Sequence, residues 1–547
     1  MGLGLPPMAY GDGIGKRRQV AFLGYSHNLS ARDGELWDMK NLTSDYSPLL
    51  APRAPRYHIR TLTKPNGFYA HGGLYWVDGT GFYADGEKKG DVTDSKKQFA
   101  SLGKYIVILP DKAYYDTQTK ELGNIEASWG GENGLSATFD DGTLYGEPAE
   151  ANTITAADVT WSDYFRVGDG VTISGCTNEM ANNKTAVIVE IEGNKLIFSE
   201  NCFVISVEKQ VDEEGKETEI RNSITETNVK IKREMPELDY ICENENRLWG
   251  CKGDTIYACK LGDIFNWNVL DGISTSSYAT QVGSAGDFTG MCSYLGYVIA
   301  FKEEHIYKVY GSKPSNFEVL SSASLGVEAG SSKSLAIAGE VLFYLSRTGV
   351  MAYTGGIPQL ISAPFGTVRY QNAVGGSDGV KYYVSMQDMD GTYTMFVFDT
   401  RTNLWHKEDG LQVIGFGWDK ELYFLDSTGK LWMNGNARTV PDGAIVEQSV
   451  ESMAEFGDFV EDDPNQKGVS KLQLRMELSE GAAVTIAMMF DSDGVWQEVK
   501  SLTAQKKRSY YLPIIPQRCD HFRIKITGIG AWKLYSLVRE SYIGSEI

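Results

Sequence analysis

Along much of the chain, apolar and aromatic positions fall in pairs of short segments joined by a turn that contains Gly or Asp. In the first pair, residues 74–77 precede the turn and residues 81–83 follow it. Short runs rich in aromatic and β-branched residues, bounded by turn residues, are typical of antiparallel β-strands. Seven such pairs lie within residues 73–83, 104–116, 246–258, 297–310, 341–353, 381–399 and 421–432. We therefore expect seven β-hairpins.

The spacing of these pairs predicts a repeat architecture. The last four are centred near Val298, Leu342, Tyr382 and Leu422, which are 44, 40 and 40 residues apart. A period of ~40–50 residues with about four strands per unit is typical of a β-propeller blade. Because one blade cannot bury both faces of its sheet, the copies must stack. We expect an all-β, seven-bladed β-propeller built from residues 61–125 (blades 1 and 2) and 236–440 (blades 3 to 7), with Tyr75 and Tyr423 in one domain.

About 110 residues interrupt the repeat between its second and third copies. This insert, residues 126–235, begins with a Gly-rich stretch and continues with a compact β pattern at 161–173. Residues 185–198 predict a hairpin whose turn is Glu192-Gly193-Asn194. We expect a small β-barrel that contributes to subunit contacts or to a channel.

The two ends of the chain lack the repeat. Residues 1–60 predict an extended arm, because prolines 48, 52 and 55 disfavour a helix and suggest a segment docked on a neighbouring subunit. Residues 441–547 predict a linker, with one short strand at 457–460, followed by a β-sandwich. Strand patterns at 470–478, 483–490 and 521–526 support the sandwich.

Charge and composition limit the functional classes. The chain has 72 acidic and 52 basic residues, a formal net charge of −20. Gripping nucleic acid requires clustered Lys and Arg, so we expect DNA to be repelled or passed, not held; an acidic surface that aids solubility is the simpler explanation of the charge alone. The seven cysteines include no C-x-x-C pair, and the six histidines are scattered. These patterns predict neither a disulfide scaffold nor a metal site.

Catalytic motifs are also incomplete. A phosphate-loop-like stretch, Gly11-Asp12-Gly13-Ile14-Gly15-Lys16, has Tyr10 where a P-loop requires Gly and Arg17 where it requires Ser or Thr. Segments 427–432 and 491–496 resemble the Asp-box of propeller glycosidases but lack its spacing, and we interpret both as turns. The paired aromatic residues are typical of a packed interior more than of sugar platforms. We assign no catalytic, cofactor-binding or metal-ligating residue, and we expect no enzyme activity and no cofactor.

Three groups of residues resemble a known family. They are Asn41-Leu42, Tyr46-Ser47-Pro48 and Arg53; Glu245-Asn246-Arg247-Leu248-Trp249-Gly250 with Asp263 and Trp267; and Pro516-Gln517-Arg518-Cys519-Asp520-His521-Phe522 with Gly528 and Gly530. With the repeat and its insert, they resemble the packaged-DNA stabilisation or tail-hub proteins of short-tailed bacteriophages, also called nozzle proteins. The resemblance spans most of the chain and brings no active-site residues.

This resemblance implies a structural virion protein of a phage tail. Copies would form a ring, a hexamer in the family, below the portal, with portal or adaptor and other tail proteins as partners and with DNA passing through the lumen without specific binding. The chain would be made in the host bacterial cytoplasm, without membrane insertion, and end in the virion. One alternative is a tail-tip or receptor-binding protein whose C-terminal domain binds carbohydrate. Another is a propeller enzyme or binding module outside phages.

Overall fold

In the residues that it describes, the computed structural model has β-strands as its main secondary structure, with a few short 3-10 helices. These are residues 15–28, 32–144, 147–199, 202–211, 217–270, 273–435, 438–461, 466–503, 507–515 and 517–543. Within them lie 50 strands and five one-turn 3-10 helices, and no α-helix. They contain no helix with the length and apolar character needed to cross a membrane. The all-β prediction is confirmed.

Six antiparallel sheets have four strands in consecutive order, so that each strand pairs with the next in sequence. Each predicted hairpin except the last, at 421–432, forms the two middle strands of one of these sheets. The first three sheets are β6–β9 (Pro65–Ala70, Leu74–Asp78, Gly81–Ala84, Glu87–Asp91), β10–β13 (Gln98–Leu102, Tyr105–Leu109, Ala113–Asp116, Glu121–Asn124) and β23–β26 (Tyr240–Asn244, Arg247–Lys252, Thr255–Ala258, Tyr278–Gln281). The next three are β27–β30 (Gly290–Tyr294, Tyr297–Lys302, His305–Tyr310, Glu318–Ala323), β31–β34 (Ala336–Ala338, Val341–Ser346, Gly349–Tyr353, Gln359–Leu360) and β35–β38 (Tyr370–Ser377, Lys381–Asp388, Tyr393–Asp399, Leu404–Lys407).

A seventh sheet joins the two ends of the repeat. It contains β39 (Val413–Asp419), β40 (Glu421–Asp426), β41 (Lys430–Met433), β5 (Tyr57–Thr61) and β42 (Ile445–Val446), in that order. Its fourth strand, β5, therefore comes from the N-terminal part of the chain. Gly417 in β39 approaches β6 so closely that a Cβ there would lie 2.7 Å from the Cβ of Ala70. The first and last copies of the pattern are thus neighbours, and Tyr75 and Tyr423 lie in the same compact unit.

The chain divides into two compact units. One contains residues 1–78 and 327–547, and the other contains residues 79–326. The first unit holds the sheets from β31 to β42 and the C-terminal sheets, and the second holds the sheets from β10 to β30 and the insert.

The insert forms a closed barrel, as predicted. Its strands are β14 (Ala127–Trp129), β15 (Leu135–Leu144), β16 (Glu147–Thr155), β17 (Gly170–Ser174), β18 (Thr185–Glu192), β19 (Lys195–Phe198) and β22 (Ile224–Arg233). The sheet follows the order β22-β15-β16-β19-β18-β17, and β17 pairs again with β22, which closes six strands. Gly193, with φ +58°, forms the predicted turn between β18 and β19. Trp161, expected in a strand, instead begins a 3-10 turn and fills the barrel core.

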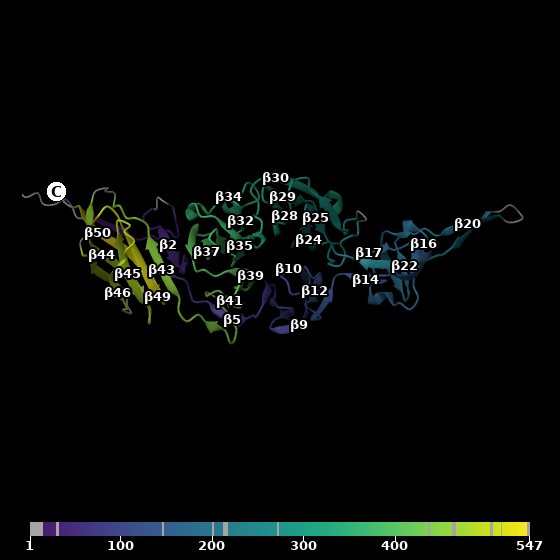
Figure 1. The fold of residues 1–547 in the computed structure, drawn as a ribbon, viewed down its shortest axis with the longest axis horizontal. Helices are drawn as coiled ribbons and strands as arrows, with labels where there is room; N and C mark the ends of the chain where they lie inside the picture. Colours follow the sequence, from purple (N-terminus) through teal and green to yellow (C-terminus); the bar gives the residue numbers. More distant parts are fainter. Residues whose placement is uncertain are drawn as a thin grey trace, which may run out of the picture. The chain divides into compact units, whose positions relative to one another are not determined.

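Two five-stranded sheets share one hydrophobic core near the C-terminus. They are β1-β50-β44-β47 with β48 on β44, and β2-β43-β49-β45-β46 (Figure 1). The strands are β1 (Gly15–Gln19), β2 (Leu36–Lys40), β43 (Glu451–Phe456), β44 (Lys467–Leu478), β45 (Ala483–Phe490), β46 (Gln497–Leu502), β47 (Arg508–Pro513), β48 (Arg518–Cys519), β49 (Phe522–Ile529) and β50 (Trp532–Ile543). Residues of β49 alternate between buried and more exposed, the pattern of a strand with one face on a core.

The N-terminal segment is not the extended arm that the sequence predicted. Strand β1 pairs with β50, and β2 pairs with β43, so both complete the C-terminal sheets. Leu36 and Met39 have no exposed surface and join the core of those sheets. The sequence allowed a short strand at 16–22, which overlaps β1, but it did not indicate the pairing of either strand, because each pairs with residues more than 400 positions away. The predicted linker also contains β43, which lies before the expected strand at 457–460.

Candidate functional site

Three groups of residues carried the resemblance to a known family, and they are called the family-like groups. The first of them, around Asn41 and Arg53, lies where the N-terminal segment meets the rest of its compact unit. The side chain of Asn41 donates from Nδ2 to the carbonyl of Glu451 (2.8 Å) and accepts from Nε of Arg53 (2.9 Å). Leu42 in β3 (Leu42–Thr43) pairs with Pro52 in β4 (Ala51–Pro52). These residues hold the segment against its own chain. They therefore have a structural role, and the docking surface for a neighbouring subunit that the sequence predicted does not lie in their side chains.

A buried cluster of two arginines and three carboxylates continues this contact. Arg53 donates from Nη1 to Glu447 (2.8 Å), and Arg56 donates from Nη1 to Asp409 (2.6 Å) and from Nη2 to Glu408 (2.5 Å). The side chains of Arg53 and Arg56 are only 5% and 2% exposed. Burial by itself raises the pKa of Glu447, but hydrogen bonding and charge from Arg53 outweigh it, so the pKa lies below its usual value. The cluster holds three distant segments together.

The second family-like group organises a long loop in the other compact unit. Arg247 is 2% exposed, and its guanidinium donates to the carbonyls of Cys259 (2.8 Å), Ser276 (2.6 Å) and Ser274 (2.7 Å). Since these carbonyls lie between β25 and β26, Arg247 ties Cys259 to residues 274–276 of the same loop. The arginine therefore acts as an internal scaffold for the loop.

That loop anchors the inserted barrel. Phe265 lies under the guanidinium of Arg166 in the insert, with 4.0 Å from Cζ to the ring centre, and packs on Tyr114 of β12 with ring centres 5.1 Å apart. Asn266 accepts from the main-chain N–H of Gly170 (2.8 Å) and donates to Asp169 (3.2 Å). The barrel is thus attached through side chains as well as through its two connecting strands.

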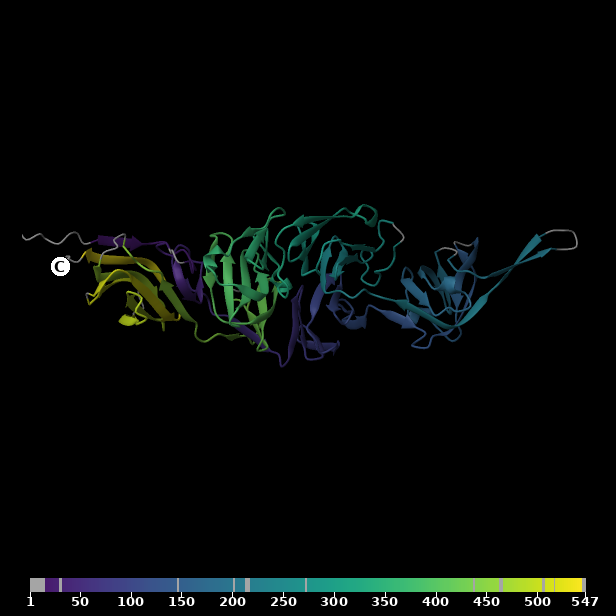
Figure 2. The same ribbon diagram turned by 45° about the horizontal axis from the view of Figure 1, so that its top comes forward.

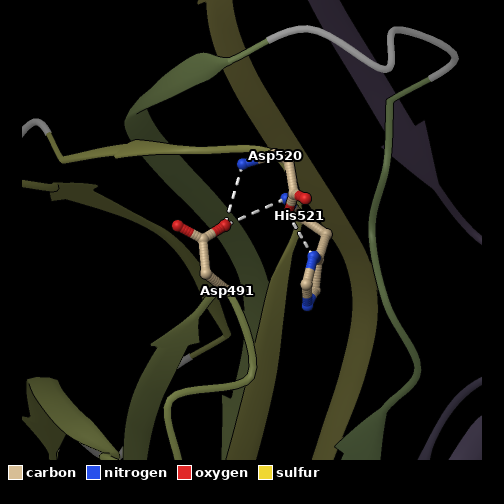
Figure 3. Close-up of side chains that lie close together, drawn as sticks. All are labelled: Asp491, Asp520 and His521. Atoms are coloured by element: carbon tan, nitrogen blue, oxygen red, sulfur yellow. Dashed lines mark hydrogen bonds and ion pairs between the residues drawn. The ribbon is translucent and has the colours of Figure 1, made fainter.

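The third family-like group brings an acidic pair and a histidine together, although Pro516 lies outside the described residues. Asp491, Asp520 and His521 have ligand atoms within 4.8 Å of one another. Figure 3 shows the carboxylate of Asp491 accepting from the main-chain N–H of Asp520 (2.8 Å). His521 Nδ1 bonds Asp520, and Nε2 lies 2.8 Å from Ser492 Oγ. Hydrogen bonds from Asp491 and His521 lower the pKa of Asp520.

This cluster fits a hydrogen-bonded turn better than a metal site. Both nitrogens of His521 already have protein partners, and both carboxylates are exposed. The sequence analysis assigned no metal ligand, and it did not detect this grouping because 28 residues separate Asp491 from Asp520. The only signal in the sequence is the adjacent Asp520-His521 pair.

The segments that resembled catalytic motifs have structural roles in the described residues. Asp426 accepts at Oδ1 from the N–H groups of Thr428 (2.9 Å) and Lys430 (3.0 Å), and at Oδ2 from Trp432 Nε1 (2.8 Å). The interpretation of 427–432 as a turn, between β40 and β41, is confirmed. Gly15 and Lys16 belong to β1, and the rest of the phosphate-loop-like stretch, 11–14, lies outside the described residues.

One exposed element joins no larger sheet in the described residues, although Arg221 in it lies 3.7 Å from Asp141 of β15. Strands β20 (Ser206–Val211) and β21 (Glu217–Asn222) form a two-stranded ribbon that projects from the barrel (Figures 1 and 2). Val207 and Val211 are 49% and 60% exposed. An isolated two-stranded hairpin is marginally stable in water. The ribbon is therefore a candidate contact element for another molecule.

A pocket of about 440 Å³ lies where the N-terminal segment meets the C-terminal sheets. Tyr46, Trp532 and Lys533 help to line it, together with Glu480 and Gln448. The ammonium group of Lys533 lies 3.9 Å from the centre of the Tyr46 ring. Polar and apolar side chains both line it, as is usual for a pocket that binds a small molecule.

Comparisons with known proteins give no family. No protein-family model and no curated protein matches the chain. Among solved structures, Raptor of Chaetomium thermophilum is 12% identical with a TM-score of 0.30, covering 71% of this chain and 30% of that one. BBS1N, solved in complex with ARL6DN, is 10% identical with a TM-score of 0.31 and coverage of 71% and 98%. An exo-β-1,3-galactanase of Phanerochaete chrysosporium is 8% identical with a TM-score of 0.21 and coverage of 55% and 94%. These values are too low to assign a fold or a function.

Proposed function

We propose that the chain is a structural subunit of a short-tailed bacteriophage tail, the hub or nozzle ring that lies below the portal and retains packaged DNA. In this proposal the seven consecutive sheets form one seven-bladed β-propeller, with the barrel inserted between blades 2 and 3 and the paired C-terminal sheets forming a sandwich. The supporting observation is the closure of the seventh sheet by β5, which links the start of the repeat to its end. Such a closure would hold a ring of blades together.

The bodies outside the repeat supply surfaces for assembly. The barrel carries the exposed β20–β21 ribbon, and a chain that assembles into a ring needs surfaces on two sides for its neighbours. The ribbon would contact the next copy or another tail protein. Because the family-like residues Arg53 and Arg247 are buried and bonded within the chain, they would preserve the shape of the subunit.

The channel would pass DNA without holding it. The net charge of −20 opposes phosphate, and the counterion release that drives DNA binding requires clustered cations. At ~0.15 M salt the Debye length is ~8 Å, so the repulsion is short-ranged and does not block passage. Purified protein should therefore show no measurable binding to duplex DNA at about that salt concentration. Tight, salt-sensitive binding would contradict the channel proposal.

A phage that lacks the chain provides the test of function. Particles made without it should package DNA and then lose it, and supplying the wild-type chain in trans should restore retention. The measurement is the amount of DNA protected from nuclease per particle, followed over time. Particles that keep their DNA and fail only to adsorb to cells would overturn the hub proposal.

That last outcome would favour a second candidate, a tail-tip or receptor-binding protein. The pocket beside Tyr46, Trp532 and Lys533 favours it, because it gives the C-terminal body a hollow with both an aromatic ring and hydrogen-bonding groups. Loss of adsorption on substituting Lys533 with Ala, with DNA retention unchanged, would support this alternative.

A further inference from the structure

Trp418 differs from every other tryptophan in the chain. All eleven tryptophans lie in the described residues. Trp418, at 48% exposure, is the one tryptophan among them that counts as exposed. It is the penultimate residue of β39. Trp432 and Trp532, by comparison, donate their indole N–H groups to Asp426 and to Ser452. The indole N–H of Trp418 makes no hydrogen bond to the described residues, so one aromatic face and one donor are available to a ligand.

This ring lines a pocket of about 530 Å³. Trp418, Val380 and Leu422 form its apolar part, and Arg401, Lys420 and Arg438 bring positive charge. The volume lies within the range of ~300–1,000 Å³ that is usual for sites that bind small molecules. All of these residues belong to one compact unit. The pocket is therefore a candidate binding site with both a stacking surface and cations.

Arg401 is held in place for binding an anion. Its Nε and Nη2 donate to Asp399 at 3.0 and 2.7 Å, and the side chain of Asp399 has no exposed surface. Ser44 also donates to Asp399 (2.6 Å). Two of the three guanidinium nitrogens are thus fixed, while Nη1 makes no hydrogen bond to the described residues and the side chain remains 56% exposed. A cation whose orientation is set before binding loses less entropy when it captures a carboxylate.

Two further cations of the pocket lack a carboxylate partner within the described residues. Glu421 accepts from the main-chain N–H groups of Arg438 (2.6 Å) and Thr439 (3.2 Å), so it holds that segment through its backbone. The side chains of Arg438 and Lys420 are left without an ion pair in this part of the chain. By contrast, Lys381, in the same pocket, pairs with Asp45 at 2.5 Å. Arg401 is itself paired with Asp399 and lies 3.7 Å from Asp45, so the positive charge without an ion pair to the described residues lies with Lys420 and Arg438.

We propose that this pocket binds an acidic saccharide, with the sugar ring stacked on Trp418 and its carboxylate paired with Lys420 and Arg438, next to the remaining donors of Arg401. A sugar ring offers an apolar face for the indole and hydroxyl groups that both donate and accept hydrogen bonds. The hydroxyls suit a wall that also contains Asp45, Asp378 and Glu421. A single strand of nucleic acid is the other ligand class that combines stacking with negative charge, and a DNA octamer distinguishes it from the saccharide.

The inference does not depend on the proposed tail function. It concerns the turns after β35, β37 and β39, and not the C-terminal body to which the alternative function would assign carbohydrate binding. A saccharide site at these turns would let the protein recognise a polysaccharide, whichever assembly the protein belongs to. Loss of DNA retention in the phage experiment and loss of saccharide binding are separate measurements.

Isothermal titration calorimetry on the full chain tests the site. The probes are a hyaluronan tetrasaccharide, which carries carboxylates, a chitin tetrasaccharide, which is neutral, and a single-stranded DNA octamer. We expect binding of the hyaluronan probe, and at least tenfold weaker binding of the other two. Trp418→Ala should weaken the hyaluronan affinity at least tenfold, whereas Trp496→Ala, a half-buried tryptophan of the C-terminal body, should leave it unchanged.

A charge variant keeps the test decisive if the tryptophan variant misfolds. Lys420→Gln with Arg438→Gln changes two exposed side chains without ion pairs to the described residues and should weaken binding several-fold at unchanged melting temperature. Equal affinity for the neutral probe would overturn the acidic-sugar assignment, and tighter binding of the octamer would assign the pocket to nucleic acid. Absence of binding by all three probes would overturn the proposal.

Discussion

The N-terminal segment and the β20–β21 ribbon both lie outside the repeat, yet their surroundings differ in kind. Residues 36–56 add strand β2 to a C-terminal sheet and place Arg53 and Arg56 in a buried cluster of charges. The ribbon pairs only with itself, and Val211 is 60% exposed. A segment whose polar groups are satisfied by its own chain contributes to stability. A segment whose apolar groups face solvent contributes little to stability and leaves that surface available for contact with another molecule.

The strongest expected effect comes from Arg56→Ala. The substitution removes the close partner of Glu408 and Asp409 and leaves them only the longer contacts to Arg53, at 3.7 and 3.5 Å. Breaking a buried ion pair costs about 3–5 kcal/mol, and we expect the lower end of that range because Arg53 remains. Urea unfolding should show this loss in the free energy of unfolding. Lys40→Ala is the matched control, because Lys40 and its partner Glu451 are 47% and 67% exposed, and an exposed pair contributes at most about 1 kcal/mol. Equal effects of the two variants would contradict a scaffold role for the segment.

Phe265→Ala should have a slightly smaller effect. The ring packs between Arg166 of the insert and Tyr114 of β12, and removing a buried Phe side chain costs about 3–5 kcal/mol. We expect the lower end of that range, because the neighbouring tyrosines can move into the space. Hydrogen exchange should show faster opening where the barrel joins the loop, while protection of the ribbon stays unchanged. Faster exchange confined to the ribbon would contradict the anchoring account.

Acid should destabilise the region around the N-terminal segment. Burial, with the nearby positive charge of Lys381, lowers the pKa of His406 from 6.5 to about 4. A histidine with a lower pKa in the folded state takes up a proton on unfolding, so stability is complete above pH 6.5 and falls as the pH drops to about 4. The loss is on the order of 3 kcal/mol over that window.

His406→Gln should remove most of this pH dependence, measured as the midpoint of urea unfolding between pH 4 and pH 7. His71→Gln, at an exposed position, should leave the dependence as it is in the parent chain. The carboxylate of Glu447 adds to the loss at lower pH, because its pKa is below the ordinary value of 4.5. A flat profile in the parent chain would show that His406 titrates normally.

The smallest effect on stability should come from replacing the ribbon. Ser206 and Asn222 are paired across it, so a two-residue Asn-Gly turn can replace residues 207–221. We expect a change in the free energy of unfolding below about 0.5 kcal/mol, as for exposed changes in general. Incorporation into particles should be lost, as measured by immunoblot of purified phage. Normal incorporation of the ribbon-less chain would contradict its role as a contact element.

The repeat could be predicted because its information is local. Each predicted hairpin has its partners close in sequence, from Leu342 with Tyr353 in β32 and β33 to the widest pair, Lys381 with Asp399 in β36 and β37. The turn at Gly193 was predicted for the same reason. The sequence allowed a short strand near β1, but its pairing was not predicted, because four of its five residues are exposed and its partner β50 lies at the other end of the chain.

Site chemistry was harder to predict than the fold. The exposed Trp418 has the same sequence signature as the buried Trp405, an aromatic residue at a strand position. Only the packing of the folded chain distinguishes them. The Asp491 and His521 contact also depends on two turns that meet only after folding. The sequence could therefore predict strands and repeats, but not which polar and aromatic groups remain available.

Electron cryomicroscopy of the tail of purified particles tests the central proposal most directly. The account predicts a ring of copies of this chain around the DNA exit channel below the portal, with each β20–β21 ribbon in contact with a neighbouring copy or tail protein. Density for the chain only at the distal tip or on fibres, or a particle without it, would contradict the account.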